Sequence, residues 1–232
     1  MALTQDPRWP AVDSFTLSQL HPSSRPNSAA LKHALKNSRE HGLRDIAVSA
    51  CEGKFLALQC RMAKVKHALE IGTLGGYNSI WMASENPDLH VTTVELDPKT
   101  AEVARENIRF AGLSDRVEVL VGDATKVIET LHAEIEQQKR PRFGFVFIDA
   151  DMEVNWSFFN PSVELCLPGA AIIVDNIVLG GTIVTEKFLS DKRVAGSRHA
   201  VEVAGENPKV DGVVVQMVSS KSYDGILLAV LK

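Results

Sequence analysis

HALEIGTLGGYNS, at residues 67–79, is the stretch that decides the fold of this chain. It begins with the apolar residues of a buried strand, which runs through Ile71. Three glycines follow, Gly72, Gly75 and Gly76, and they allow the backbone to turn tightly and to approach a ligand without a Cβ in the way. The residues after them can open a helix, so the stretch predicts the strand, turn and helix of a nucleotide-binding βα unit. Similar turns also occur without a ligand, and the turn alone leaves both interpretations open.

The length and composition of the chain indicate one α/β domain with an added segment. With 232 residues the chain can bury a substantial core, whereas two full domains would be cramped. A net charge of -4 and a pI near 6.0 provide no basic surface for nucleic acid or for an acidic membrane. Cys51, Cys60 and Cys166 are widely spaced in apolar surroundings, which favours reduced thiols over disulfides or a zinc site. With no signal peptide and no apolar run long enough for a membrane span, we expect a cytoplasmic protein.

Residues 1–47 are expected to form an N-terminal arm and a helix, ahead of a main domain at residues 48–232. The first 25 residues contain three prolines and predict an irregular arm. The apolar side chains of this arm either pack on the same subunit or cross to the second subunit of a homodimer. A helix capped by Asn27 or Ser28 follows and ends at Gly42.

Acidic residues follow the next two predicted strands. Glu95 ends the strand at residues 89–94, about twenty residues beyond the glycine turn, where nucleotide-binding units place a ligand of the ribose. The strand at residues 117–121 is closed by Gly122 and Asp123. A solvated strand end would also explain Glu95, but its distance from the glycine turn favours the ribose role.

Two further strands are continuous apolar runs, as expected of central parallel strands that are covered on both faces. The run at residues 145–148 ends in Asp-Ala-Asp from Asp149, and the run at residues 170–174 ends in Asp-Asn from Asp175. Helix caps would explain an isolated pair of acids. Two neighbouring strands with polar carboxyl ends instead favour a ligand site, because open α/β sheets bind ligands at that edge.

The C-terminal part predicts an antiparallel edge. We expect a helix at residues 186–201 and strands at residues 213–218 and 226–231, with a hairpin turn at residues 223–225. The predicted fold class is therefore α/β, a doubly wound and mostly parallel sheet with helices on both faces and an antiparallel C-terminal edge.

In this setting the sequence resembles the cation-dependent class I O-methyltransferases, the family of catechol O-methyltransferase and caffeoyl-CoA O-methyltransferase. The resemblance covers about residues 48–232 and rests on several motifs in the right order. These are SACEGKFL from Ser49, EIGTLGGYNS from Glu70, VELDP from Val94, GDA from Gly122, FIDAD from Phe147, DN from Asp175 and DG from Asp224.

The resemblance implies a site for S-adenosyl-L-methionine and a site for a metal. The residues implied to bind the cofactor are Glu70, Gly72, Tyr77 and Asn78 around it, Glu95 at the ribose, Asp123 and Ala124 at the adenine, Asp151 near the amino-acid end, and also Asp149. The implied metal ligands are Asp149, Asp175 and Asn176. These oxygen donors suit a hard divalent cation such as Mg²⁺.

One residue departs from the family pattern. The family usually carries a lysine directly after the Asp-Ala-Asp acids, as the base that takes the hydroxyl proton, and this position is Met152. Either metal and water suffice, or Glu153 or His199 substitutes, or the usual reaction has been lost. We expect metal activation with a changed base, with Asp149 and Glu153 as the catalytic residues.

The expected function is methyl transfer from S-adenosylmethionine to the hydroxyl of a small phenol or catechol, aided by the cation. Two alternatives stay open at this point. One is a cofactor-binding protein that has lost methyl transfer, and the other is a nicotinamide-dependent oxidoreductase, for which the glycine spacing is less suitable.

Overall fold

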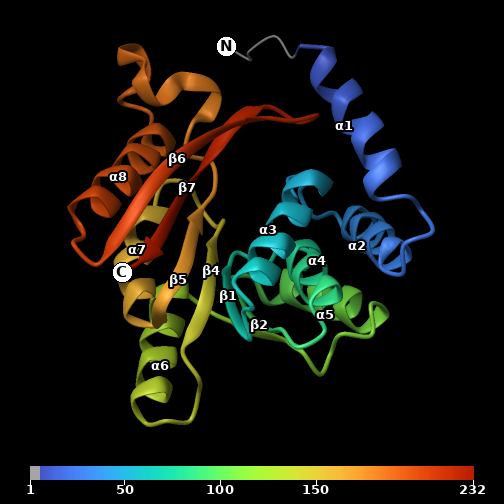
Figure 1. Cartoon of the computed structure of the whole chain (residues 1–232), viewed down its shortest axis with the longest axis horizontal. Helices are drawn as coiled ribbons and strands as arrows, with labels where there is room; N and C mark the ends of the chain where they lie inside the picture. Colours follow the sequence, from blue (N-terminus) through green and yellow to red (C-terminus); the bar gives the residue numbers. More distant parts are fainter. Residues whose placement is uncertain (1–5) are drawn as a thin grey trace.

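A seven-stranded sheet in the order β3-β2-β1-β4-β5-β7-β6 forms the centre of the molecule (Figure 1). The computed structural model describes residues 6–232. The strands are β1 (His67–Ile71), β2 (His90–Glu95), β3 (Val117–Val121), β4 (Phe143–Ile148), β5 (Cys166–Val174), β6 (Val210–Val218) and β7 (Tyr223–Leu231). The helices are α1 (Arg8–Leu20), α2 (Ser28–Glu40), α3 (Ala50–Met62), α4 (Tyr77–Glu85), α5 (Pro98–Phe110), α6 (Ala124–Glu136), α7 (Asn155–Glu164) and α8 (Lys192–Glu206).

The first five strands are parallel, and β7 pairs antiparallel with both β5 and β6. The predicted fold class is therefore confirmed, including its antiparallel edge. The strand order reverses between β1 and β4, which lie side by side although β2 and β3 come between them in the chain. In a doubly wound sheet, this reversal opens a crevice at the carboxyl ends of the two strands.

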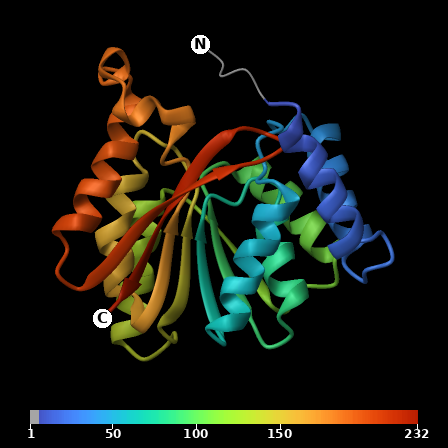
Figure 2. The ribbon, with the colours of Figure 1, turned by 45° about the horizontal axis from the view of Figure 1, so that its top comes forward.

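Helices cover both faces of the sheet (Figure 2). Alternate residues of β4 show the two cores: Val146 and Ile148 pack with side chains of α6, α7 and α8, whereas Phe145 and Phe147 pack with side chains of α2, α3, α4 and α5. All four β4 side chains are fully buried. This explains why the strand reads as a continuous apolar run, because neither of its faces reaches water.

The N-terminal segment differs from the predicted irregular arm. Residues Arg8–Leu20 form helix α1, and Pro10 lies in its first turn. A proline is tolerated there because the first N–H groups of a helix have no acceptor within the helix. None of the residues of α1 is buried, and Phe15 is 67% exposed. The expected division at residue 48 stays a prediction.

Two details of the C-terminal half also differ from the predictions. The hairpin between β6 and β7 turns at residues 219–222, where the Ser219 N–H donates to the Ser222 carbonyl. Gly225, expected in the turn, instead lies within β7, where a Cβ would come within 2.4 Å of the Val215 carbonyl oxygen. The predicted helix at residues 186–201 is a short 3-10 turn, Glu186–Phe188, followed by the separate helix α8, which Asp191 caps.

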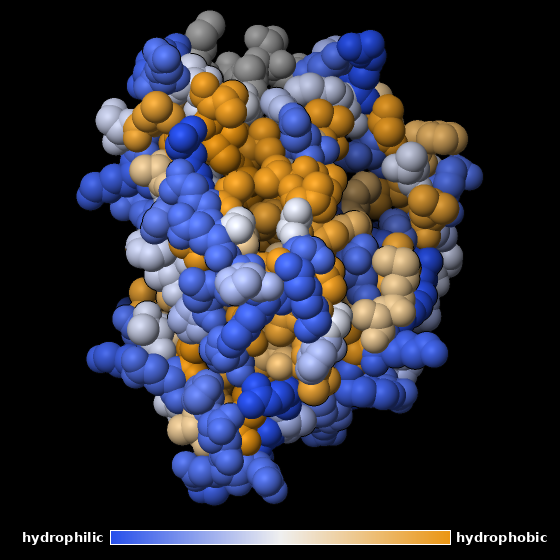
Figure 3. Space-filling model, turned by 60° about the vertical axis from the view of Figure 1, so that its left-hand side comes forward, coloured by the Kyte–Doolittle hydropathy of each residue, from blue (hydrophilic) through white to orange (hydrophobic). Residues whose placement is uncertain are grey.

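Apolar side chains remain exposed on the side of the molecule that carries α8 and the edge strand β6 (Figure 3). On β6, Val213 is 55% exposed and Val218 is 53% exposed. Within residues 6–232, no helix is long and apolar enough to cross a membrane.

Candidate active site

A cavity of about 1250 Å³ lies at the carboxyl ends of β1, β4 and β5. It also reaches the ends of β2 and β3, the segment at residues 44–49 and the β6–β7 hairpin. The structure brings nearly all of the predicted site residues to its walls. These are Gly72, Tyr77, Asn78, Glu95, Asp123, Ala124, Asp149, Asp151, Met152, Glu153, Asp175 and Asn176.

The glycine turn forms one wall of this cavity. Gly72 has a φ of +103°, and a Cβ at this position would lie 2.0 Å from the Asp149 carbonyl oxygen. Gly76, with a φ of +74°, is the N-cap of α4. Both conformations favour glycine. The turn therefore brings the backbone of β1 directly beneath the Asp-Ala-Asp motif at the end of β4.

The carboxylate of Glu95 ties β2 to the glycine turn. Its Oε2 accepts a hydrogen bond from the Leu74 N–H at 2.9 Å, and its Oε1 accepts one from the Asp97 N–H at 3.0 Å. Each oxygen keeps a free lone pair for a ligand hydroxyl. Nearby, Asp123 caps α6 by accepting a hydrogen bond from the Thr125 N–H at 2.8 Å.

Glu70 is the exception among the predicted site residues, because it is fully buried and does not line the cavity. Its Oε2 accepts hydrogen bonds from Ser79 and, at 2.7 Å, from the Thr93 hydroxyl. Its Oε1 has no hydrogen-bond partner among the described residues. Burial raises the pKa of Glu70 to about 7, against the effect of the hydroxyls of Ser79 and Thr93. Glu70 thus ties β1 to α4 and to β2, the helix after the glycine turn and the neighbouring strand.

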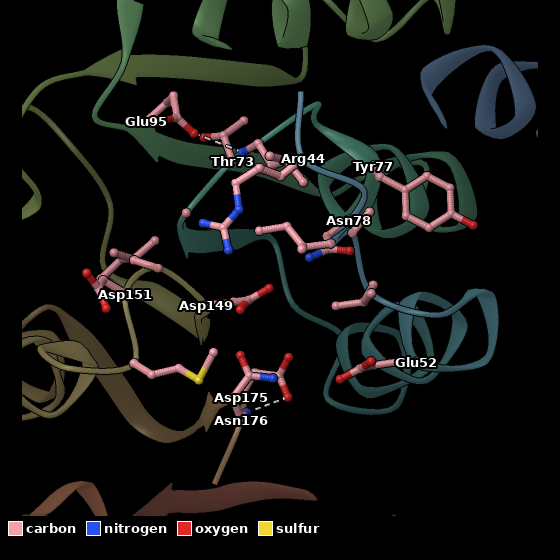
Figure 4. Close-up of a pocket in the computed structure, with 18 of the residues that line it drawn as sticks. Arg44, Glu52, Thr73, Tyr77, Asn78, Glu95, Asp149, Asp151, Asp175 and Asn176 are labelled. Carbon is pink, nitrogen blue, oxygen red and sulfur yellow. Dashed lines mark hydrogen bonds between the residues drawn. The ribbon is translucent and has the colours of Figure 1, made fainter. Parts of the chain in front are cut away.

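At the other end of the cavity, three carboxylates lie close together (Figure 4). Burial and the neighbouring charge of Asp175 raise the pKa of Asp149 well above its ordinary value. Burial and the charge of Glu52 likewise raise the pKa of Asp175 well above its ordinary value. The pKa of Glu52, which shares a hydrogen bond with Asp175, is raised to about 7 by burial and by Asp149. Such a cluster is stable only if protons or a cation offset its charge.

The backbone that carries Asn176 is held in an unusual conformation. Asn176 has a φ of +58°, and its N–H donates to the Asp175 carboxylate at 2.7 Å. Asp224 fixes the loop that follows, because its Oδ1 accepts hydrogen bonds from the N–H groups of Val178 and Leu179 at 3.0 and 2.9 Å. The Asp-Gly motif of the sequence is therefore a support for the loop after β5.

Within residues 6–232, no three or more His, Cys, Asp or Glu side chains are arranged to hold a metal ion. The implied metal set contains only two residues of these types, Asp149 and Asp175, since its third member is Asn176. The side chains of all three line the same end of the cavity. Their oxygens are the donors that a hard divalent cation prefers.

The candidates for a replacement base differ in position. Met152 and Glu153 both line the cavity, and the Glu153 side chain is exposed. His199 does not line it. Its ring instead packs against Trp156 with a centroid distance of 4.4 Å and forms a hydrogen bond with Glu202. This position disfavours His199 as the base.

Four residues to which the sequence assigned no site role also line the cavity: Arg44, Glu52, Lys221 and Asp224. The backbone of Glu52 lies in the first turn of α3, where its N–H donates to the side chain of the N-cap Ser49 at 3.2 Å. The side chain of Glu52, however, points toward Asp175 (Figure 4). Lys221, on the β6–β7 hairpin, donates a hydrogen bond to the Ala47 carbonyl. This bond joins the hairpin to the segment at residues 44–49, and the two together are called the roof of the cavity.

Comparison with known proteins identifies the kind of enzyme to which this cavity belongs. A sequence model described as O-methyltransferase matches residues 21–231. The chain belongs to the O-methyltransferase family. The resemblance inferred from the sequence motifs is thereby confirmed, and the family membership favours this enzyme class over a nicotinamide-dependent oxidoreductase.

Several relatives of this O-methyltransferase match over nearly their whole length. It is 51% identical to the O-methyltransferase imqG of Aspergillus flavus, over 98% of this chain and 93% of the relative. It is 40% identical to a catechol O-methyltransferase of Mycobacterium tuberculosis, over the full length of both. A crystal structure of an O-methyltransferase from Bacillus cereus in complex with SAH is 37% identical, with a TM-score of 0.88, over 97% of this chain and 99% of that one.

Proposed function

We propose that this O-methyltransferase transfers the methyl group of S-adenosylmethionine to a hydroxyl of a small phenol or catechol, with the aid of a divalent cation, most simply Mg²⁺. The observation that carries the proposal is the single cavity that joins the glycine turn and Glu95 at one end to Asp149, Asp175 and Asn176 at the other. A methyl donor and a hydroxyl acceptor can meet in it.

The cofactor is assigned to the half of the cavity near the glycine turn. Glu95 would bind the ribose hydroxyls, since both of its oxygens are oriented by backbone N–H groups. Asp123 and Ala124 would contact the adenine, and Tyr77, Asn78 and Asp151 would surround the rest. Glu70 would act through Ser79 rather than by contact. The SAH complex of the Bacillus cereus relative supports this assignment.

The cation is assigned to Asp149, Asp175 and Asn176. Their donor set fits it, because the buried carboxylates of Asp149 and Asp175, with Glu52 beside them, repel one another without a compensating charge. When bound, a divalent cation supplies an orienting contact for the acceptor and lowers the pKa of its hydroxyl. The catechol O-methyltransferase relative supports an acceptor with vicinal oxygens.

The side chains of this enzyme then have defined roles. Asp149 lies where the two halves of the cavity meet, and it keeps the acceptor oxygen and the methyl group in one place. Glu153, next to Met152, is assigned as the acceptor of the hydroxyl proton because it lines the cavity and opens to solvent. Glu52 supports Asp175 from α3.

The proposal is tested by methyl transfer from radiolabelled S-adenosylmethionine to a panel of phenols and catechols, with Mg²⁺ or with EDTA. We expect transfer to at least one catechol, loss of transfer in EDTA, and a loss of at least a hundredfold in Asp175→Asn. The matched control is Asp211→Asn, on the exposed edge strand. Unchanged turnover in EDTA would contradict the metal assignment.

A second candidate function is cofactor binding without methyl transfer, which Met152 at the position of the family's lysine favours. Calorimetry would show binding of S-adenosylhomocysteine in both cases. Only the enzyme would convert the cofactor in the presence of a catechol panel.

We further propose an intracellular homodimer without a nucleic-acid partner. The three cysteines are free, as expected of a reducing compartment. Helix α1, which has no buried residue and exposes Val12, Phe15 and Leu20, would pack on the second subunit. A monomeric mass by light scattering, unchanged in Phe15→Ser, would contradict the dimer.

A further inference from the structure

Arg44 lies in the segment between α2 and α3 and lines the cavity of the active site. Figure 4 shows its guanidinium directed into the cavity, in the region of Asn78 and Asp149. Within residues 6–232, the Arg44 side chain forms no hydrogen bond and no ion pair. A guanidinium that points into a cavity without a partner presents all five of its N–H donors to whatever the cavity binds.

The other cations of the cavity are differently engaged. Lys221 donates to the Ala47 carbonyl, and Arg193 is paired with Asp191 at 2.9 Å. Of the cationic side chains that line the described cavity, Arg44 is thus the one whose charge is not directed at the protein.

The remaining walls of the cavity are strongly acidic. Glu95 at one end and Asp149, Asp175 and Glu52 at the other all carry carboxylates. Such walls favour cationic ligands and repel an anionic group. A ligand that carries a carboxylate would therefore need a dedicated cation, and the planar fork of an arginine matches a carboxylate with two parallel hydrogen bonds.

We propose that Arg44 is the residue that binds a carboxylate of the ligands in this cavity. Two sources of that carboxylate share the same chemistry: the amino-acid end of the cofactor, and an acidic substituent on the aromatic acceptor. The inference rests on the proposed function, which places both ligands here.

The cofactor arm of the test needs binding alone. Isothermal titration measures the affinity of the wild type and of Arg44→Gln for S-adenosylhomocysteine and for 5′-methylthioadenosine, which lacks the amino-acid carboxylate. If the cofactor supplies the carboxylate, Arg44→Gln lowers the affinity for S-adenosylhomocysteine by about tenfold or more and leaves the affinity for 5′-methylthioadenosine unchanged. Arg39→Gln, an exposed arginine of α2 outside the cavity, is the matched control.

The acceptor arm uses turnover at saturating cofactor. The kcat/KM values for 3,4-dihydroxybenzoate and for its neutral amide are compared in the same three proteins. If the acceptor supplies the carboxylate, the preference for the acid over the amide falls by about tenfold or more in Arg44→Gln. Arg44→Lys, which keeps the charge but loses the fork, is expected to fall between the wild type and Arg44→Gln.

A change by the same factor for both members of both ligand pairs would overturn the inference, and so would no change in either arm. Thermal melts of Arg44→Gln identify a folding defect, which would lower the affinity for all ligands by the same factor. Failure of the proposed function would show in the wild type alone, as absence of cofactor binding or of transfer. The inference depends only on the ratios between paired ligands, so the two failures are distinguishable.

Discussion

Gly72 and Asp149 lie in such close contact that a Cβ on Gly72 would be 2.0 Å from the Asp149 carbonyl oxygen. The two residues end adjacent parallel strands, and the Asp149 N–H donates to the Ile71 carbonyl at 2.8 Å. The half of the cavity at the glycine turn and the half that contains Asp149 and Asp175 are therefore joined through backbone atoms. Any side chain at Gly72 must push the two halves apart.

Gly72→Ala is accordingly expected to destabilise the enzyme by more than about 2 kcal/mol and to abolish binding of S-adenosylhomocysteine. Both the clash and the positive φ contribute. Gly112→Ala separates them, because Gly112 also has a positive φ, +68°, but a Cβ there meets nothing within 4 Å. We expect about 1 kcal/mol for this control in urea unfolding, with normal binding. Equal losses for the two variants would contradict the role of the close contact.

Glu85 is expected to contribute strongly to stability, because its side chain is only 7% exposed and forms ion pairs with three cationic side chains. It pairs with Lys54 at 2.7 Å, with Arg61 at 2.9 Å and with Arg25 at 3.0 Å. Glu85→Gln should lower the free energy of unfolding by roughly 2–3 kcal/mol, since Lys54 would be left nearly buried without its counter-charge.

The exposed pair of Lys66 and Asp88 supplies the control for Glu85. Both of these side chains are more than half exposed, and such surface pairs contribute little, so Asp88→Asn should lower the free energy of unfolding far less than Glu85→Gln does. Burial opposes ionisation of Glu85, but its three cations outweigh burial and lower its pKa. Its contribution is thus present at neutral pH and is lost as the pH falls below the ordinary glutamate range. Equal effects of the two substitutions in urea unfolding would refute this account.

The strands and the glycine turn could be predicted because their signals are local. Apolar runs, the glycines before α4 and acids such as Glu95 each lie within a few residues of the element that they specify. Helix α1 was missed because its prolines suggest a break, although Pro10 lies in the one turn of a helix that tolerates it. The hairpin turn was predicted at residues 223–225 instead of 219–222 because Asp-Gly at Asp224 is a common turn sequence. In the structure, the Asp224 side chain instead holds the loop after β5.

The roof of the site could not be predicted from local patterns. Ala47 and Lys221 are far apart in the chain, and only the completed sheet brings them together. Glu52 has two roles, of which only the first is local. Its backbone N–H donates to the side chain of Ser49, the N-cap of α3, but its carboxylate belongs to the acidic cluster with Asp175, and the sequence around α3 contains no information about that second role.

Glu70 predicts a particular dependence of stability on pH. Its pKa is raised from 4.5 to about 7 by burial, so the folded protein holds this proton more tightly than the unfolded chain. This contribution to stability is complete below the unfolded pKa and is lost as the pH rises through about 7. It amounts to roughly 3 kcal/mol at most.

Glu70→Gln, which keeps an oxygen for Ser79 and Thr93, should therefore flatten the fall in stability of the ligand-free enzyme between about pH 5 and pH 8. Urea unfolding at a series of pH values measures this slope. The control is Glu186→Gln, an exposed residue, which should leave the slope unchanged. A Glu70→Gln slope as steep as that of the wild type would show that Glu70 is ionised in the fold.

Met152→Lys tests how the acceptor hydroxyl loses its proton. Met152 lines the cavity among acidic residues, so a lysine ammonium there would be stabilised rather than strained. A missing general base typically costs two to four orders of magnitude in rate, roughly 10²–10⁴. If a divalent cation already activates the hydroxyl, the added lysine should change kcat by less than about tenfold, and EDTA should abolish transfer by both proteins. Met152→Leu, which keeps the apolar volume, controls for packing.

A rise in kcat of a hundredfold or more in Met152→Lys alone would show instead that this enzyme lacks an effective base. Methyl transfer by Met152→Lys in EDTA would show that the cation is dispensable.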